Sequence, residues 1–185
     1  LVRLSYDQPV ETFAVNMMGT IHVLEAARKV NSVKSIVNVT TDKCYENKNS
    51  TSSFQEDDPM GGHDPYSASK GCVELISHAY RKSFFEKEGI SIATARAGNV
   101  VGGGDWAKDR LVPDVLCALQ NNYTLEVRSP HSVRPWQHVL EPLSGYLLLA
   151  ERLFHDGQKY SEGWNLGPLE GEAKPVEWVV KALCN

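Results

Sequence analysis

The sequence has 185 residues, 42% of them apolar and 23% charged, with a formal net charge of −4. A chain of this size can bury a core of its own, and its acidic balance argues against a nucleic-acid partner. No apolar run approaches the ~20 residues that span a bilayer, and no signal peptide is visible. We expect a cytoplasmic protein that binds neither membranes nor nucleic acid.

Cysteine and histidine spacing gives no sign of a metal or disulfide site. The six histidines form no H-x-H or H-E-x-x-H pattern, so we expect no metal. The cysteines form no C-x-x-C pair, which favours reduced thiols in a cytoplasmic protein. They are Cys44, Cys72, Cys117 and Cys184.

Hydrophobic periodicity predicts alternating helices and strands. Apolar residues at helical spacing predict a helix over about 9–30. The run "KSIVNVTT" is typical of a strand buried on both faces, and the polar residues 43–64 are expected to form a loop. A helix over about 65–88 should begin at Asp64 as N-cap, with Pro65 at its first position.

The second half continues the alternation. "GISIATARAG" predicts another buried strand. The remaining expected elements are helices at 110–121, 141–154 and 175–183, and strands at 124–127, 135–139 and 163–167. Strands that alternate with helices predict an α/β fold, a doubly wound parallel sheet with helices on both faces.

The helix expected at 65–88 has an apolar arc wider than one buried stripe requires. One side could pack on the sheet and the other on a partner subunit, or the whole arc could form a single large core contact. The arc consists of Cys72, Val73, Leu75, Ile76, Ala79, Tyr80, Phe84 and Phe85.

The segment "YSASK" places Tyr66 and Lys70 one helical turn apart on the same face. A phenol has a pKa of about 10 and needs ~4 kcal/mol of phenolate stabilisation to act as a base near pH 7. One cation at ~4 Å supplies roughly that at an effective dielectric of ~20. The pair can therefore take a proton from an alcohol, although the two positions alone could also occur by chance on a solvated helix.

A second polar group follows the strand that ends in "VTTDKCY". Ligands bind at the carboxyl ends of parallel strands, where Thr41 offers a hydroxyl, Asp42 a carboxyl and Lys43 an ammonium. A plain strand-end turn with solvated charges is the alternative.

The glycine-rich stretch "VVGGGDWAKD", residues 100–109, matches the G-x-G-x-x-(G/A) spacing of a dinucleotide-binding loop. Glu126 follows at about the offset of a ribose-binding carboxylate. Asp105, however, would place a carboxylate beside the pyrophosphate, and Trp106 would hinder close backbone approach. Pro113 argues against a long helix beginning at this loop. We interpret the glycines as shaping a loop at a sugar-nucleotide pocket.

Four ordered motifs resemble those of the extended short-chain dehydrogenase/reductases. They are "N-x-x-G-T" from Asn16, "TTDKCY", "YSASK" and "RAGNVVG". Within that family, "TDKCYEN", "GGGDWAKDRLVPD" and "RPWQHVLEPLSGYL" resemble the CDP-glucose 4,6-dehydratases. The dTDP-glucose relatives have T-D-E where this chain has Thr41-Asp42-Lys43, and an R-D-W-type segment where it has Arg134-Pro135-Trp136.

The resemblance implies NAD-dependent dehydration of CDP-glucose in deoxysugar and O-antigen biosynthesis. Tyr66, with Lys70 and Thr41, would take the proton of the C4 hydroxyl while NAD takes the C4 hydride; Tyr66 and Lys70 would also bind NAD. Asp42 would act as the acid for water leaving C6, and the hydride would return to C6. Lys43 stands where relatives have the C5 base; it would take that proton or stabilise the enolate.

The resemblance also implies a Rossmann-like fold. Residues 1–100 would form the second half of the NAD-binding domain. Residues 101–185 would form the sugar-nucleotide portion, with elements returning to the first domain. The implied substrate contacts are Asn99, Arg110, Leu111 and Arg134, with Trp106 and Arg128 as further candidates. We expect a homo-oligomer formed through helices 9–30 and 65–88.

The family's phosphate-binding fingerprint, G-x-x-G-x-x-G, does not occur in this sequence. We therefore expect this chain to be part of a longer protein, incomplete at both ends and inactive alone. The alternatives are a nucleotide-sugar 4-epimerase, which would not need Asp42 as an acid, and a non-catalytic nucleotide-binding relative.

Overall fold

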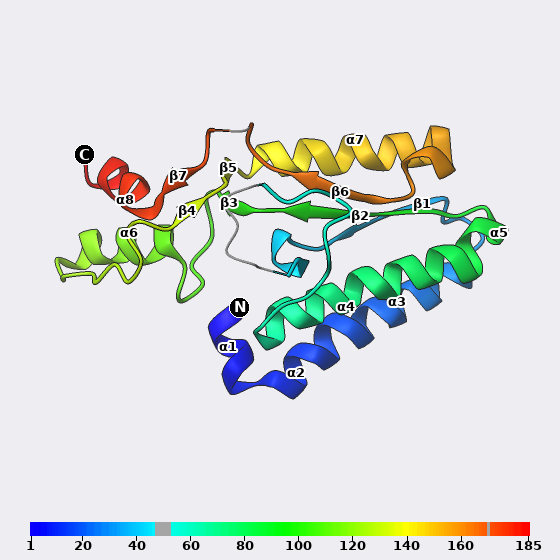
Figure 1. Cartoon of the computed structure of the whole chain (residues 1–185), viewed down its shortest axis with the longest axis horizontal. Helices are drawn as coiled ribbons and strands as arrows, with labels where there is room; N and C mark the ends of the chain where they lie inside the picture. Colours follow the sequence, from blue (N-terminus) through cyan, green and yellow to red (C-terminus); the bar gives the residue numbers. More distant parts are fainter. Residues whose placement is uncertain (47–52, 170) are drawn as a thin grey trace. The chain divides into compact units, whose positions relative to one another are not determined.

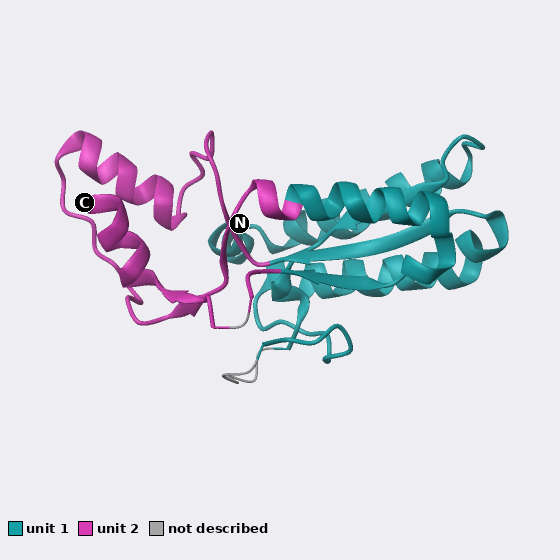
Figure 2. Cartoon of the chain, turned by 90° about the horizontal axis from the view of Figure 1, so that it is seen from above, with its two compact units in different colours: residues 1–97, 143–166 teal, residues 98–142, 167–185 magenta. Residues whose placement is uncertain are grey.

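The computed structural model describes residues 1–46, 53–169 and 171–185. The chain divides into two compact units (Figure 2). Unit 1 comprises Leu1–Ala97 and Leu143–Leu166, and unit 2 comprises Gly98–Pro142 and Gly167–Asn185.

Unit 1 is built on a parallel sheet of three strands in the order β1-β2-β6. β1 (Ser35–Val39) pairs with β2 (Ser91–Ala97), and β2 pairs with β6 (Gly163–Leu166). All seven residues of β2 are buried, as expected for the central strand of a parallel sheet covered on both faces. The predicted parallel α/β architecture is confirmed.

Helices cover both faces of this sheet. Figure 1 shows α7 (Leu140–Asp156) along one face, and α4 (Pro65–Tyr80) with α3 (Gly19–Arg28) along the other. Side chains alternate along β2, as the twofold periodicity of a strand requires. Ala93 and Ala95 pack with Leu149 and Leu153 of α7, whereas Ile92 joins a core with Leu24, Phe85 and Ile90.

The predicted helices of unit 1 form with small departures. The helix expected over 9–30 consists of α2 (Pro9–Phe13), a π-helical turn (Ala14–Met18) and α3, and it ends at Arg28. A further short helix, α1 (Val2–Asp7), precedes it. The helix expected over 65–88 continues from α4 through a π-helical turn (Arg81–Phe85) and α5 (Glu86–Glu88). Gly89 ends it in the left-handed conformation, φ 70°.

The segment expected as a loop at 43–64 contains a little regular structure. A 3-10 turn covers Asp42–Cys44, and Tyr45 forms an isolated antiparallel bridge with Met60. Residues 47–52 of this segment lie outside the described residues. A second 3-10 turn, Gly157–Tyr160, joins α7 to β6.

Unit 2 contains two small sheets and two helices. β3 (Asn99–Val101) pairs in parallel with β5 (Trp136–His138), and β4 (Val133–Arg134) pairs antiparallel with β7 (Lys174–Pro175). The helices are α6 (Leu111–Asn121) and α8 (Val176–Cys184).

The strand predicted at 124–127 was wrong. Leu125 and Val127 are half-buried between exposed neighbours, which is the alternation that suggested a strand. The segment belongs to no ladder in the described residues, because alternating burial needs only an extended chain on a packed surface. A strand also needs a hydrogen-bonded neighbour.

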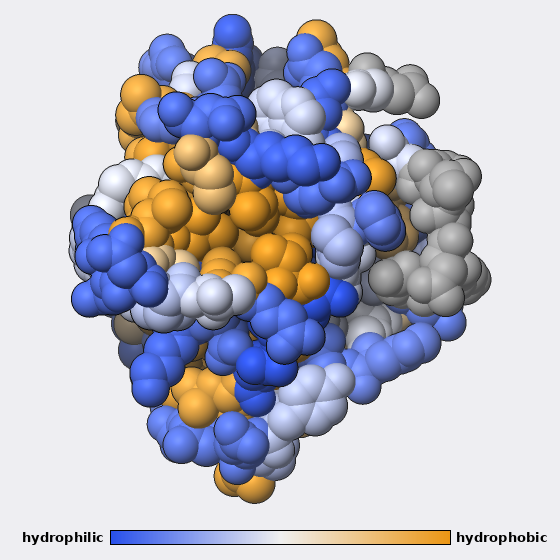
Figure 3. Space-filling view, turned by 90° about the vertical axis from the view of Figure 1, so that its left-hand side faces the viewer, coloured by the Kyte–Doolittle hydropathy of each residue, from blue (hydrophilic) through white to orange (hydrophobic). Residues whose placement is uncertain are grey.

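Unit 2 exposes several large apolar side chains. Figure 3 shows apolar residues gathered in one area of the face that it displays. In unit 2 the exposed large apolar residues include Trp106, Leu119, Tyr123, Val133, Leu169 and Trp178. No helix in the described ranges is long and apolar enough to cross a membrane.

The Phe85 side chain is fully buried in the core between α3, the α4 run and β2. Phe85→Ala should lower the free energy of unfolding by ~3–5 kcal/mol, because it removes transfer free energy and leaves a cavity. Phe154→Ala is the matched control, since Phe154 is 61% exposed on α7 and its loss should stay within ~0.5 kcal/mol. Urea unfolding measures both; equal losses would contradict this packing.

Candidate active site

The first turn of α4 is held by side chains that cap its free backbone groups. The Asp64 carboxylate accepts hydrogen bonds from the Ser67 amide at 2.9 Å and from the Ser67 hydroxyl at 2.6 Å. The Tyr66 amide, another free donor of the first turn, donates to Ser5 Oγ of α1 at 3.1 Å. The predicted start of this helix is confirmed, and the backbone that carries Tyr66 is fixed from two sides.

A second tie joins this turn to the first long helix. Ser69 Oγ, fully buried, donates to the Tyr66 carbonyl at 2.7 Å and accepts from Asn16 Nδ2 at 2.8 Å. Asn16 lies in the π-helical turn Ala14–Met18, a local widening that often occurs at functional sites. The asparagine of the N-x-x-G-T motif therefore supports the helix that carries Tyr66.

Lys70 lies one turn beyond Tyr66, and both side chains are half-buried. Burial lowers the pKa of Lys70, and the negative charge of Glu74 opposes that shift. Within the described residues, the Lys70 ammonium has no hydrogen bond or ion pair to another side chain. Three N–H donors are thus available to a bound molecule. Vicinal hydroxyls, such as those of a ribose, fit this donor set.

The turn after β1 brings the second group of candidates together. Thr41 is the N-cap of the 3-10 turn, and its hydroxyl oxygen accepts from the Lys43 amide at 3.3 Å. The same hydroxyl donates to Asp42 Oδ1 at 3.2 Å, and Lys43 Nζ lies 3.8 Å from that oxygen. Thr41 is buried, whereas the side chains of Asp42 and Lys43 are 26% and 39% exposed. The Asp42 carboxyl and the Lys43 ammonium are therefore partly accessible to solvent, on a turn that Thr41 holds in place.

This turn, Asp42–Cys44, packs directly on α4. A Cβ added to Gly71 would lie 3.4 Å from the Cys44 carbonyl oxygen, so the small residue allows close approach. Cys44 is fully buried, and burial raises the pKa of its thiol to about 12. The thiol is therefore unreactive, and its role is packing beside Lys70.

Two predicted substrate contacts lie on short strands of unit 2 that belong to different two-stranded sheets. Asn99 begins β3 and pairs with Trp136 of β5. Arg134 in β4 is exposed and pairs with Lys174 of β7. Two cations directly opposite each other across an antiparallel pair repel unless an anion lies between them. Lys174 could not be singled out from the sequence, because its opposition to Arg134 arises only from the strand pairing.

The other predicted substrate contacts lie on the glycine-rich loop and near it. Arg110 occupies the N-cap position of α6 without a side-chain capping bond, and its guanidinium lies 3.4 Å from Asp105. Arg128 lies 3.8 Å from Asp109. Both arginines are more than half exposed. Leu111 is the half-buried first residue of α6.

The loop does not have the geometry of a dinucleotide fingerprint, in which the glycines lead straight into a helix. Here α6 begins only at Leu111. Gly104 has φ 81°, and a Cβ on Gly102 would lie 2.6 Å from the Val139 side chain. Trp106 is 65% exposed. The glycines thus serve a tight turn and a close approach within unit 2.

A family model described as GDP-mannose 4,6 dehydratase matches residues 1–161. The chain belongs to this family, and the resemblance to the extended short-chain dehydrogenase/reductases is confirmed.

Individual proteins extend the comparison. The chain is 56% identical to a CDP-glucose 4,6-dehydratase of Salmonella typhimurium over 99% of its own length and 52% of that protein. It is 30% identical to a dTDP-glucose 4,6-dehydratase of Streptomyces griseus over 70% of its length and 38% of that protein. The chain therefore spans about half the length, or less, of these curated relatives.

Solved structures share the fold. A dTDP-glucose 4,6-dehydratase double mutant of Streptomyces venezuelae, with NAD and DAU bound, superposes with a TM-score of 0.82 at 24% identity, covering 99% of this chain and 53% of that one. A UDP-glucose 4-epimerase of Thermus thermophilus in complex with NAD gives 0.79 at 22% identity, covering 99% and 57%.

Replacement of Lys70 tests whether its partly buried charge destabilises the folded protein. Because burial lowers its pKa, the unfolded chain binds the proton more tightly than the folded one. At neutral pH the partly buried, charged ammonium therefore lowers the free energy of unfolding. This cost disappears as the pH rises from the lowered pKa of Lys70 in the folded protein to the ordinary lysine pKa of the unfolded chain. Lys70→Met should raise Tm by a few degrees at neutral pH, where ~2–4 °C corresponds to ~1 kcal/mol, and the gain should shrink at high pH.

The control is Lys82→Met in the same helical run. Lys82 is 57% exposed and pairs with Glu86, so its loss should leave Tm nearly unchanged. Calorimetry across pH measures both variants. A Lys70→Met protein that is less stable than the parent at neutral pH would contradict this prediction. It would show that favourable interactions of the ammonium outweigh the cost of its burial.

Proposed function

We propose that this protein is a nucleotide-sugar 4,6-dehydratase, a hydro-lyase that converts CDP-glucose to CDP-4-keto-6-deoxyglucose with tightly bound NAD. One structural observation carries the proposal. The turn Thr41–Lys43, with its carboxyl and ammonium, is packed against the helix that presents Tyr66 and Lys70. The 56% identity to a CDP-glucose 4,6-dehydratase supports the choice of CDP-glucose.

Tyr66 acts as the base for the C4 hydroxyl in this proposal. The Lys70 ammonium, one turn away, favours the phenolate by charge. Thr41 contributes a hydroxyl that can hydrogen-bond the same sugar oxygen. Lys70 also holds the ribose of NAD through its available N–H groups. Bound NAD supplies the chemistry that these residues lack, by accepting the C4 hydride and returning it to C6.

Asp42 acts as the acid for water leaving C6. It is the partly exposed carboxyl of the turn, and Thr41 hydrogen-bonds one of its oxygens and thereby orients it. Lys43 lies beside the same carboxyl and interacts with the charge that develops when the C5 proton is removed. Lys43 either takes that proton or stabilises the enolate.

The substrate diphosphate binds to unit 2 in this proposal. Arg134 supplies a guanidinium suited to paired phosphate oxygens. Lys174, opposite it across β4 and β7, supplies a second positive charge. The further proposed contacts are Asn99, Trp106, Arg110, Leu111 and Arg128.

The broader organisation is also proposed. Residues 1–100 belong to the NAD-binding domain, and residues 101–185 form the sugar-nucleotide portion. We place the protein in the cytoplasm, in deoxysugar synthesis for O-antigen, as a homo-oligomer formed through helices 9–30 and 65–88. Exposed apolar side chains on these helices support that contact; they include Val15, Met18, Val23 and Leu75.

Asp42→Asn in the intact protein tests the elimination step. The amide cannot donate the proton, so product formation should fall by ~10²–10⁴-fold. Because C4 oxidation does not need this acid, reduced nicotinamide should accumulate when CDP-glucose is added, and its absorbance should rise. Asp156→Asn on α7, where Asp156 pairs with Arg152, is the control and should behave like the parent. Unchanged inversion at C4 in the variant, with no 4-keto-6-deoxy product from either protein, would favour a 4-epimerase.

Arg134→Met and Lys174→Met test the diphosphate contact. Each should raise the substrate Kd by ~10-fold or more, since a charge-assisted hydrogen bond contributes about 1.5–3 kcal/mol. Arg152→Met on α7, 52% exposed, is the control. Calorimetric titration with CDP in the intact protein measures the three variants. An unchanged Kd in both Arg134→Met and Lys174→Met would remove this strand pair from the binding site.

A further inference from the structure

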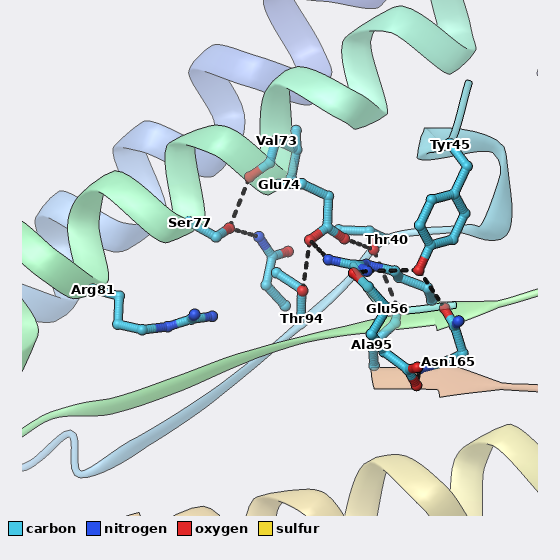
Figure 4. Close-up of polar contacts among 12 residues, drawn as sticks. Thr40, Tyr45, Glu56, Val73, Glu74, Ser77, Arg81, Thr94, Ala95 and Asn165 are labelled. Carbon is cyan, nitrogen blue, oxygen red and sulfur yellow. Dashed lines mark hydrogen bonds and ion pairs between the residues drawn. The ribbon is translucent and has the colours of Figure 1, made fainter. Parts of the chain in front are cut away.

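A buried ion pair connects the sheet of unit 1 with helix α4. Arg96 of β2 donates from a terminal guanidinium nitrogen to Glu74 Oε2 at 2.8 Å, and the side chains are 6% and 5% exposed. Thr94 Oγ1 donates to the same carboxylate at 2.6 Å, and Thr40 Oγ1 donates to its other oxygen. Figure 4 shows Glu74, Thr40 and Thr94 converging between the helix and the strands. The Glu74 carboxylate thus accepts from three side chains.

Stability alone does not account for this pair. Two charges removed from water have a desolvation cost that their attraction often fails to offset, and apolar residues of similar volume commonly do as well or better. Arg96 Nε is buried and has no hydrogen-bond partner in the described part of the chain, which adds a further cost. A Cβ on Gly163 would lie 2.2 Å from Arg96, so this neighbouring strand must also accommodate the guanidinium.

The pair is joined to both ends of the turn that carries Asp42. Thr40 directly precedes Thr41, the N-cap of the 3-10 turn Asp42–Cys44, and donates to Glu74. Tyr45 directly follows the turn, and its hydroxyl accepts from Arg96 at 2.6 Å. The Tyr45 hydroxyl in turn donates to Asn165 of β6 at 2.7 Å. Movement of the turn relative to α4 would therefore break hydrogen bonds to a buried charge at either end.

The same carboxylate also acts on the helix that carries the base. Glu74 lies one turn beyond Lys70 on α4, and its charge raises the pKa of Lys70 against the effect of burial. The loss of Glu74 would leave the Arg96 guanidinium unpaired nearby, which would disfavour a charged Lys70 further. One ionised pair thus bears on both halves of the proposed site.

We propose that Glu74 and Arg96 are positioning residues that fix the Thr41–Lys43 turn relative to Tyr66 and Lys70. This inference rests on the proposed dehydratase function. The acid on the turn must meet the C6 oxygen of a sugar whose C4 oxygen is held by the base on the helix. Placement errors near 1 Å in such a site can reduce rates by ~100-fold. The network contacts no reacting atom and acts through the turn.

Thr40→Val and Tyr45→Phe test the proposal, because each removes one anchor of the turn and keeps both buried charges. In the intact protein each should leave C4 oxidation within ~3-fold of the parent and slow elimination ~10-fold or more. Reduced nicotinamide should then accumulate during turnover, with KM nearly unchanged.

Thr94→Val is the matched control. Thr94 also donates to Glu74 and is 1% exposed, but it lies within β2 and anchors no end of the turn. It should lower stability as much as Thr40→Val without accumulation of reduced nicotinamide. The proposal fails if, in all three variants, the rates of C4 oxidation and elimination fall together, in proportion to the loss in free energy of unfolding. The network would then be only structural. The Asp42→Asn experiment tests the dehydratase function separately, because it leaves the network intact.

Discussion

One buried ion pair, Glu74 with Arg96, joins helix α4 to strand β2. A guanidinium within a fully buried strand must be paired and hydrogen-bonded, because an isolated charge there would have a prohibitive desolvation cost. That requirement determines what surrounds it. Hydroxyls from Thr40, Thr94 and Tyr45 point inward, and Gly163 leaves room on the neighbouring strand.

The polar character extends along the sheet-facing side of α4. Beyond Glu74, Ser77 accepts a hydrogen bond from Asn38 of β1 at 2.8 Å, and Arg81 donates to the Ile92 carbonyl at 3.2 Å. Figure 4 shows Ser77 and Arg81 on the same side of the helix as Glu74. Lys70 lies four residues before Glu74 and is the first of this row of polar side chains. It lies near the N-terminal end of α4, which also carries Tyr66.

The two ends of the α4 run therefore have different roles. At the far end, Phe85 packs with Leu24 and Ile92 in a conventional apolar core, which supplies hydrophobic stabilisation. At the near end, polar groups with specific partners fix the turn after β1 and support the helix that bears Tyr66. Directional hydrogen bonds define a position more narrowly than apolar contacts do. This division places rigidity where the proposed chemistry needs it.

Periodicity predicted the elements of unit 1 because long apolar runs carry a strong signal. The i, i+4 spacing in YSASK singled out Tyr66 and Lys70, and the end of a predicted strand singled out Thr41, Asp42 and Lys43. The partnership of Glu74 and Arg96 could not be found in this way, since it joins residues from a helix and a strand. One signal was present: an arginine among the small and apolar residues of "SIATARA" requires a buried partner.

Two other misses have similar causes. The opposition of Arg134 and Lys174 depends on strand register, which short strands separated by about forty residues do not reveal in the sequence. The apolar arc of residues 65–88 does not form a single core contact, because Leu75 is 62% exposed, and the apolar pattern omitted the polar side chains of α4 that bond to the strands. A count of apolar residues alone therefore missed the polar part of the contact between α4 and the sheet.

In the proposed dehydratase, one site oxidises C4, removes water across C5 and C6, and moves hydrogen from C4 to C6. CDP-glucose carrying deuterium at C4 tests this mechanism most directly, with the intact protein and mass spectrometry and NMR of the product. The expected product is a 4-keto-6-deoxy sugar with the deuterium on C6. A product that keeps deuterium at C4, or a sugar that retains its C6 oxygen, would contradict it.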